Sequence, residues 1–391
     1  MGCEGSRFEK TPLVPANELK SLLNEHQVEG IVLTWFESHR VSSQCAGFVD
    51  AKHEQKMSED VWMPFGMMGQ VVLASFAARR LSRRRINLNT KVEKLLLQIG
   101  STFRIESVKG QEAWTKDLTL HHLFQHTSGL QRQQDRTTEN ESISDSDKAP
   151  LENGCRLLLC AKPGTVARLA DTNFLLLEHI IEALEGGREG LKTSLRRYLD
   201  SGVMKDAGIW ESMTKARVDS FRCSGERNSC LFNALCGTPK SLAHFLLLLG
   251  RSYAVNSHGR VKHAGSSLPM LRGIGFAKSG LGSMIFNAGP NSIMFHYTDM
   301  YGIRGLYMSC FKGPDAKEGA SGFLILCKGS EGAVPVVCSV ARMLLLQLNW
   351  EGVNFTKVDG SDKSSFCCTQ PSKTFMLNSL KKYVMEAFTD E

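Results

Sequence analysis

One short segment of the chain places nucleophile and base residue types side by side. The segment HTSG contains His126 and Ser128, and a further histidine, His296, follows much later. A serine attacks a carbonyl group only when a base lies within hydrogen-bond reach of its hydroxyl group. No such base is apparent in the sequence around Ser128, so we favour a structural role for this segment. An acyl-transfer reaction that pairs Ser128 with one of the two histidines is the alternative.

The cysteine and acidic residues do not form a recognisable metal-binding pattern. The chain has 12 cysteines but no CxxC or CxxH pair, and such close pairs are typical of zinc sites. Asp171 could hold a cation, but a single carboxylate does not make a site. Cys310, Cys327 and Cys338 lie in apolar runs, where cysteine is typical of a small core residue. We therefore expect free thiols, no metal ion and no cofactor.

The net charge of the chain is +7, and a large part of it lies in the run ARRLSRRR at 78–85. The arginines of this run are Arg79, Arg80, Arg83, Arg84 and Arg85. A basic patch of this kind suits an anionic membrane surface or an acidic protein, and we do not expect nucleic acid as a partner. The alternative interpretation is that the run is simply the solvent-exposed end of a helix and binds no partner, because runs of like charge are usually exposed.

The first six residues, MGCEGS, match the pattern for N-myristoylation. Removal of Met1 exposes Gly2 for acylation, Ser6 completes the motif, and Cys3 offers a thiol for palmitoylation. One myristoyl chain holds a protein weakly on a bilayer, whereas two chains anchor it stably. We expect no secretory leader and no transmembrane helix. The expected location is the cytoplasmic face of a plasma or flagellar membrane, and otherwise the cytoplasm.

Apolar runs that predict β-strands occur at both ends of the chain. GIVLTWFE and VSSQCAGFVDA predict an antiparallel hairpin near the N-terminus, and NSIMFHYT, GLYMSCF and GFLILCKG predict three strands in the last third. Strands at each end need partners to bury their apolar faces, and one antiparallel sheet built from both ends provides them. We therefore expect an α/β (α+β) fold, in which the first and last helices flank the sheet and a second lobe is mostly helical.

The segments between the two sets of strands are helical in pattern or polar. Apolar periodicity and caps predict helices within 67–82, 118–125, 163–187 and 238–252. The predicted division of the chain is an acylated segment at 1–16, one domain at 17–350 with a polar insertion at 131–154, and a tail at 351–391 with a short amphipathic helix at 378–388.

Several of these segments resemble the motifs of one enzyme superfamily. LTLHHLFQHTSGL at 118–130 is similar, almost residue for residue, to the motif LTLxHLLxHTSGL. PGTVARLADTNFLLLEHIIE at 163–182, TPKSLAHFLLLL from Thr238 and SGLGSMIF at 279–286 resemble further motifs in the same order. Over residues 20–350 the chain therefore resembles the serine β-lactamase-like superfamily, which contains class C β-lactamases, DD-peptidases and related esterases.

The resemblance implies a set of catalytic positions. The superfamily uses a serine at a helix start, a lysine three residues on, and a tyrosine and an asparagine in a Y-x-N turn. A histidine or lysine lies on an edge strand, where a backbone N–H completes the oxyanion hole. The residues of this chain at those positions are Met67, Gln70, Leu169, Asp171 and His296.

The residues at these positions lack the nucleophile, the base and the proton relay. A methionine thioether forms no stable acyl intermediate, a glutamine amide accepts no proton near neutral pH, and a leucine has no hydroxyl group. His296 is retained, but Phe295 and Thr298 replace the glycines that flank this histidine in the superfamily. We favour an ordinary polar residue at a sheet edge over a surviving substrate-binding group, because a general acid needs a nucleophile beside it.

The resemblance and these losses together predict a β-lactamase-like pseudoenzyme that acts as a membrane-anchored binding or scaffold protein. The expected partners are an anionic membrane surface, contacted by the acyl chains and the arginine run, and an unidentified protein for which an acidic surface is the favoured chemistry. Two alternatives stay open. One is an active esterase or peptidase that uses displaced residues, and the other is a non-catalytic sensor that binds a ligand in the old cleft.

Overall fold

The computed structural model describes residues 14–37, 40–50, 54–131, 156–204, 206–209, 231, 234–258, 282–300, 302–329 and 332–353. The predicted acylation sites Gly2 and Cys3 lie outside these residues. The polar segment 131–154, apart from Gln131, and the predicted helix 378–388 also lie outside them.

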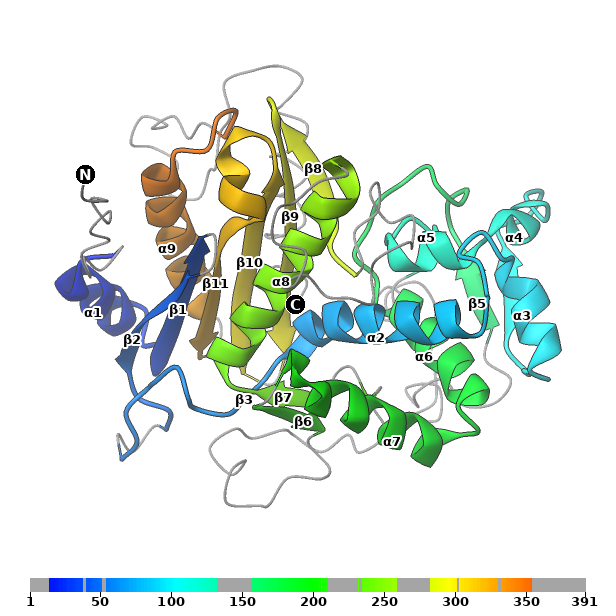
Figure 1. Cartoon of the computed structure of the whole chain (residues 1–391), viewed down its shortest axis with the longest axis horizontal. Coiled ribbons are helices and arrows are strands. Elements are labelled where there is room, and N and C mark those ends of the chain that lie inside the picture. Colours follow the sequence, from blue (N-terminus) through cyan, green and yellow to red (C-terminus); the bar gives the residue numbers. More distant parts are fainter. Residues whose placement is uncertain are drawn as a thin grey trace, which may run out of the picture.

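A six-stranded antiparallel sheet joins segments from the two ends of the chain (Figure 1). The strand order is β2-β1-β11-β10-β9-β8. The strands are β1 Gly30–Glu37, β2 Arg40–Gly47, β8 Met284–Ala288, β9 Asn291–Met300, β10 Ile303–Lys312 and β11 Ser321–Lys328. β1 pairs with β11 along its whole length, from Gly30 opposite Lys328 to Glu37 opposite Ser321. The prediction of one sheet built from both ends of the chain is therefore confirmed.

Helices cover both faces of the sheet, which explains why its inner strand β11 is buried from Ser321 to Cys327. Successive side chains of a strand point to opposite faces. Phe323 and Ile325 belong to the apolar cluster under the first and last helices, whereas Leu324 and Leu326 belong to the cluster on the other face. The covering helices are α1 Ala16–Glu25 and α9 Ala333–Leu348 on one face and α8 Pro239–His258 on the other.

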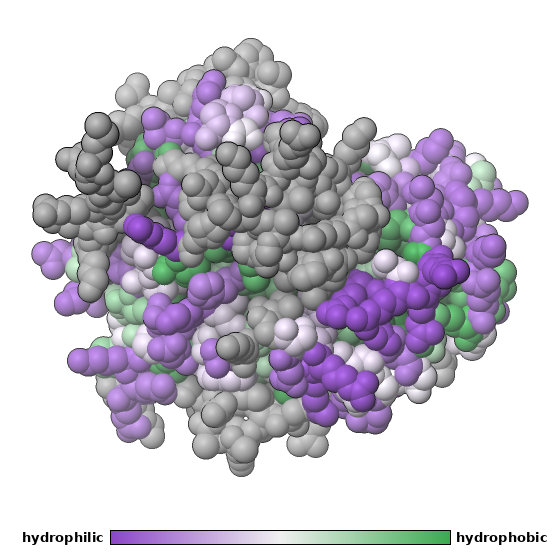
Figure 2. Space-filling model, viewed as in Figure 1, coloured by the Kyte–Doolittle hydropathy of each residue, from purple (hydrophilic) through white to green (hydrophobic). Residues whose placement is uncertain are grey.

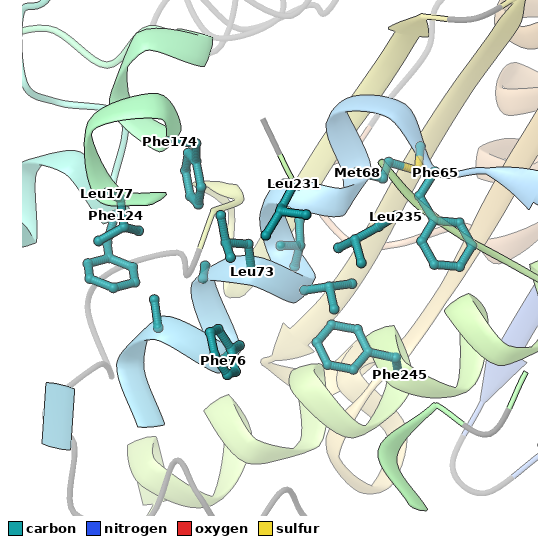
Figure 3. Close-up of a cluster of buried hydrophobic side chains, with 14 of the residues drawn as sticks. Phe65, Met68, Leu73, Phe76, Phe124, Phe174, Leu177, Leu231, Leu235 and Phe245 are labelled. Carbon is teal, nitrogen blue, oxygen red and sulfur yellow. The ribbon is translucent and has the colours of Figure 1, made fainter. Parts of the chain in front are cut away.

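A mostly helical second lobe lies beside the sheet, as predicted, and α2 runs from the sheet into it (Figure 1). Its elements are the 3-10 turn η1 Gly66–Met68 and the helices α2 Gly69–Arg83, α3 Val92–Gln98, α4 Trp114–Asp117, α5 Leu120–Phe124, α6 Asp171–Leu184 and α7 Arg188–Tyr198. Leu73 and Phe76 of α2 pack among Phe124, Phe174 and Phe245 (Figure 3), which come from α5, α6 and α8. The buried helix α2 thus ties the two lobes together.

Short elements missed by the sequence patterns complete the fold. They are the antiparallel strands β3 Met63–Pro64, β7 Leu235–Gly237 and β6 Ala207–Ile209, the parallel pair β4 Arg104–Ser107 and β5 Arg156–Leu159, and the turns η4 Leu199–Val203 and η9 Pro314–Gly319. Strands of two to four residues carry too little alternation to be recognised. The helix predicted from residue 67 starts as the turn η1, and the helix predicted at 238–252 continues to His258.

The described residues contain no helix that is both long and apolar enough to cross a bilayer. Within the same residues, no three His, Cys, Asp or Glu side chains lie together in a group that could hold a metal ion. The cysteines of these segments are free thiols.

Candidate functional site

Met67, at the predicted nucleophile position, is tied to the sheet by its backbone. It lies in η1, which leads directly into α2. Its backbone N–H donates a hydrogen bond to Oγ1 of Thr298 on β9, with the nitrogen and oxygen 3.0 Å apart. Thr298 is fully buried. The hydrogen bond holds the start of the helix against the strand that carries His296.

Gln70, at the predicted lysine position, is fully buried one turn further along. Neither its Oε1 nor its Nε2 has a hydrogen-bond partner in the described structure. Gly282 lies against the helix here, because a Cβ atom at this glycine would be 2.9 Å from the carbonyl oxygen of Gln70. Gly282 also has a φ of +71°, which glycine adopts without strain. Packing, and not hydrogen bonding, therefore holds the Gln70 side chain in place.

His126 of the HTSG segment connects three elements from a buried position. Its Nδ1 accepts a hydrogen bond from the backbone N–H of Ala170, and its Nε2 donates one to the carbonyl oxygen of Gly282, each at 3.3 Å. The side-chain amide of Asn173 lies 3.3 Å from the same Nδ1. These partners require a neutral imidazole with its proton on Nε2, and burial lowers the pKa of His126 to about 3. His126 thus holds the end of α5 against the start of α6 and the segment before β8.

His296 lies close to His126, just beyond the last residue of β9 that pairs with β8. The pairing with β8 runs only from Asn291 to Phe295, so among the described strands His296 lies on an open stretch of the β9 edge, as expected. The two imidazole rings have centroids 6.1 Å apart. Nδ1 of His296 lies 2.6 Å from the carbonyl oxygen of Tyr297, and Nε2 is buried without a hydrogen-bond partner among the described residues. Burial lowers the pKa of His296 to about 4, so the imidazole is neutral near pH 7.

The predicted Y-x-N positions hold one apolar side chain and one polar side chain that hydrogen-bonds to the adjacent residue. Leu169 is buried in the apolar cluster under the first and last helices, which also contains Tyr297 and the half-buried Met67. Asp171 begins α6, and its Oδ1 accepts a hydrogen bond from the backbone N–H of Thr172 at 2.9 Å. A carboxylate at this position interacts favourably with the positive N-terminal end of the helix dipole. The segment therefore supplies packing and a negative charge at the start of α6, and no hydroxyl group comes from position 169.

Ser128, the displaced nucleophile of the alternative interpretation, is also buried. Its Oγ accepts a hydrogen bond from the backbone N–H of Leu130 at 3.0 Å. In the described part of the chain no hydrogen bond joins Ser128 to a histidine. Gly129 follows with a φ of +77°, and a Cβ atom there would lie 2.1 Å from the carbonyl oxygen of Ala161. The serine thus shapes a tight turn beneath the site.

The structure places most of the sequence-predicted positions in one region and adds partners that the patterns did not identify. The hydrogen bond between Met67 of η1 and Thr298 of β9 brings Met67 near His296. Gly282 contacts both the backbone of Gln70 and the ring of His126. The sequence showed Thr298 only as a replaced glycine. Its hydrogen bond to Met67 links residues 231 positions apart, so no local pattern contains it. The core of this region is uncharged, and the Gln70 amide and Nε2 of His296 are buried there without a hydrogen-bond partner among the described residues.

A family model described as Beta-lactamase matches residues 16–311 of the chain. No curated protein is detectably similar in sequence. Among solved structures, the fold is similar to the octameric penicillin-binding protein homologue from Pyrococcus abyssi. The two share 15% identity with a TM-score of 0.58, over 87% of this chain and 78% of that one.

Two further solved structures share the fold. The beta-lactamase/D-alanine carboxypeptidase from Yersinia pestis has a TM-score of 0.57 at 15% identity, over 85% of this chain and 96% of that one. The D-amino acid amidase from Ochrobactrum anthropi SV3 has a TM-score of 0.55 at 13% identity, over 85% of this chain and 97% of that one. The family match spans most of the sequence and confirms the resemblance seen in its motifs: the chain belongs to the β-lactamase family.

Proposed function

We propose that this protein is a non-catalytic member of the β-lactamase family that acts as a binding or scaffold module. The observation that carries the proposal is the hydrogen bond from the backbone N–H of Met67 to Oγ1 of Thr298. In serine acyl transfer, the backbone N–H of the nucleophile's own residue commonly helps to stabilise the oxyanion. That donor must be free to reach the oxygen of a bound carbonyl group at 2.7–3.1 Å. Here the side chain of Thr298 already occupies it.

The side chains around this hydrogen bond support the same conclusion. The thioether of Met67 and the amide of Gln70 supply neither a stable acyl acceptor nor a base near neutral pH. His296 has its Nδ1 directed at the carbonyl oxygen of Tyr297, and its pKa is lowered by burial to about 4. Without a nucleophile beside it, a neutral buried imidazole has no proton-transfer partner.

A hydrolysis assay separates this proposal from an active hydrolase that uses displaced residues. The purified chain and its Ser128→Ala variant are compared on an activated ester, a cephalosporin and a D-amino acid amide. The last substrate class is chosen because one protein of similar fold is a D-amino acid amidase. We expect both proteins to match the uncatalysed rate. Turnover by the wild type that the Ser128→Ala variant lacks would establish the hydrolase instead.

The ligand-sensor alternative has a different signature. A ligand that binds the folded state raises the melting temperature in a concentration-dependent way. Acyl-D-amino acids and short D-amino acid peptides are suitable probes, because they resemble substrates of this enzyme class without needing turnover. The scaffold proposal predicts no shift with these compounds. A saturable shift without hydrolysis would support a sensor.

We further propose that acyl chains on Gly2 and Cys3 hold the protein on the cytoplasmic face of a plasma or flagellar membrane. The sequence MGCEGS supports this anchoring, because it combines a myristoylation motif with an adjacent thiol. The Gly2→Ala variant should move from the membrane to the soluble fraction of cells. The Cys3→Ser variant should show weaker, reversible attachment, since one myristoyl chain alone binds marginally. Unchanged partition of the Gly2→Ala variant would contradict the anchor.

A further inference from the structure

Two of the five arginines in the basic run form ion pairs with a carboxylate of the same protein. Arg80 forms paired hydrogen bonds with the Glu185 carboxylate, at 2.7 and 2.5 Å, and Arg84 approaches the same group at 3.4 Å. Ser194 of α7 donates a further hydrogen bond to Glu185 at 2.5 Å. The Glu185 side chain is only 2% exposed. Arg80 and Arg84 therefore balance the charge of this carboxylate, and the contact of the arginine run with a partner stays a prediction.

The same contacts bring α7 alongside the end of α2. Glu185 receives hydrogen bonds from Arg80 of α2 and Ser194 of α7. Phe76 and Tyr198 pack edge to face, with ring centroids 5.5 Å apart. Side chains on the outer sides of the two helices therefore share one surface. Figure 2 shows strongly hydrophilic residues gathered over this part of the molecule, where Figure 1 places α2 and α7.

Four arginines on this surface carry charge that no described carboxylate balances. They are Arg79 and Arg83 of α2, Arg85 of the turn that follows, and Arg197 of α7, named here the arginine surface. Arg83, Arg85 and Arg197 are exposed, and Arg79 is half-buried. None of the four forms an ion pair with a described residue. Burial lowers the pKa of Arg79, and the neighbouring charge of Arg83 lowers it further. The positive charges of these arginines repel one another, and bound anions would offset this repulsion.

We propose that the arginine surface formed by α2 and α7 binds the anionic headgroups of a membrane. The composition of the surface favours a membrane over an acidic protein. Protein interfaces rely on apolar or aromatic anchors at their centre. The large apolar side chains exposed in the described structure are Leu97, Leu158, Val166 and Leu346, and none lies on α2 or α7. Basic residues alone suffice for an anionic leaflet, each contributing about 1 kcal/mol near the surface.

The arginine surface and the proposed acyl anchor are compatible with one membrane. Thirteen residues precede Val14, and a chain of this length spans at most about 45 Å when extended. A compact chain of this size has a radius of gyration of about 21 Å. The tether can therefore extend to about twice this radius, and we infer that a lipid at Gly2 and the arginine surface can contact the same leaflet. This compatibility rests on the proposed anchor, whereas the headgroup contact itself does not.

Vesicle co-sedimentation of the full-length, non-acylated chain tests the headgroup contact by itself. The vesicles are phosphatidylcholine alone or phosphatidylcholine with phosphatidylserine. The test variant combines Arg83→Gln, Arg85→Gln and Arg197→Gln. A matched control removes the same charge from exposed positions of other elements, by Lys20→Gln, Lys94→Gln and Arg342→Gln. Thermal unfolding of all proteins verifies that the substituted chains are folded.

The proposal predicts binding only to the anionic vesicles and a decrease in affinity with increasing salt. The arginine-surface variant should bind at least about tenfold more weakly, and the control variant about as well as the wild type. Equal binding of the two variants, or equal binding to neutral vesicles, would overturn the proposal. Binding to polyglutamate without binding to anionic vesicles would assign the surface to an acidic protein instead. Because no acyl chain is present, failure here is separate from failure of the anchor, which the Gly2→Ala variant tests in cells.

Discussion

The backbone N–H of Met67 and the hydroxyl oxygen of Thr298 lie 3.0 Å apart and form a hydrogen bond between the start of α2 and strand β9. Thr298 stands where the family carries a glycine beside its strand histidine. A glycine has no side chain there, whereas the β-hydroxyl group of Thr298 binds the Met67 N–H and ties the start of α2 to the sheet. In the proposed non-catalytic site, this hydroxyl group takes the place of an incoming carbonyl oxygen.

Removing the Thr298 hydroxyl should leave the Met67 N–H without its partner. We expect Thr298→Val to lower the free energy of unfolding by about 1 to 3 kcal/mol, the usual cost of a buried unpaired donor. Amide exchange at Met67 should accelerate in this variant. Thr298→Ser is the matched control, because it keeps the hydroxyl group and should keep the Met67 amide protected. An amide that exchanges equally fast in the wild type and in both variants would show that the hydrogen bond is absent.

The two buried histidines should make the protein sensitive to acid. Burial lowers the pKa of His126 to about 3 and that of His296 to about 4, whereas an unfolded histidine titrates near about 6.5. The unfolded state therefore takes up protons first as the pH falls, and stability present above about pH 6.5 is lost toward pH 4. At about pH 5 each histidine accounts for roughly 2 kcal/mol.

Urea unfolding measured at neutral pH and at about pH 5 checks this sign and size. The wild type should lose roughly 4 kcal/mol from the two histidines together, with smaller losses in the same direction from half-buried His121 and His179, whose pKa values burial also lowers. The His296→Gln variant should lose about half as much. A wild-type stability that is flat across this range would contradict the buried neutral pair.

Gln70 should be replaceable by an apolar residue without loss of stability. Its amide is buried with no hydrogen-bond partner among the described residues, so removing it removes a desolvation cost. We expect Gln70→Met to raise the free energy of unfolding by about 1 kcal/mol. Gln70→Lys should instead lower it by several kcal/mol, because this fully buried position would remove a charged ammonium group from water. Thermal denaturation compares the two, and destabilisation by methionine would mean that the amide is hydrogen-bonded.

Glu185 should contribute more to stability than an ordinary surface carboxylate. Burial raises its pKa, but the hydrogen bonds from Arg80 and Ser194 outweigh this effect and leave the pKa below its usual range. Glu185→Gln should cost about 1 to 3 kcal/mol, less than a fully buried ion pair because Arg80 and Arg84 are partly exposed. Glu189→Gln is the control, since that carboxylate is 80% exposed and pairs with Lys192 at the surface. Equal losses in urea unfolding would contradict the role of Glu185.

The sequence predicts the fold well where segments are long and strongly patterned. The runs GIVLTWFE and GFLILCKG are apolar enough to indicate buried strands, and they pair as β1 and β11. The Gly-Gly pair predicted to end the helix within 163–187 does follow α6, with Gly186 and Gly187 at positive φ. Strands such as β8 escape prediction, because a run of five residues after a glycine-rich turn has no distinctive period.

The candidate site is less predictable, because its decisive contacts are tertiary. The motif register indicates Met67 and Gln70, but only the fold shows that Thr298 binds the Met67 N–H across 231 residues. The arginine run indicates a positive surface, yet Glu185 neutralises two of its members from 100 positions away or more. Arg197 joins that surface from α7, a helix more than 100 positions further along the chain. Residue types alone do not reveal which charges are balanced.

Covalent labelling tests the central claim of a non-catalytic site most directly. The full chain is incubated with a fluorophosphonate and with a penicillin, alongside an active serine enzyme of the same family as a positive control. Intact mass spectrometry then detects any acyl or phosphonyl adduct, and peptide mapping locates it. A non-catalytic site predicts an unmodified mass for this protein under conditions that label the control completely. A stoichiometric adduct on any serine, Ser128 above all, would contradict it.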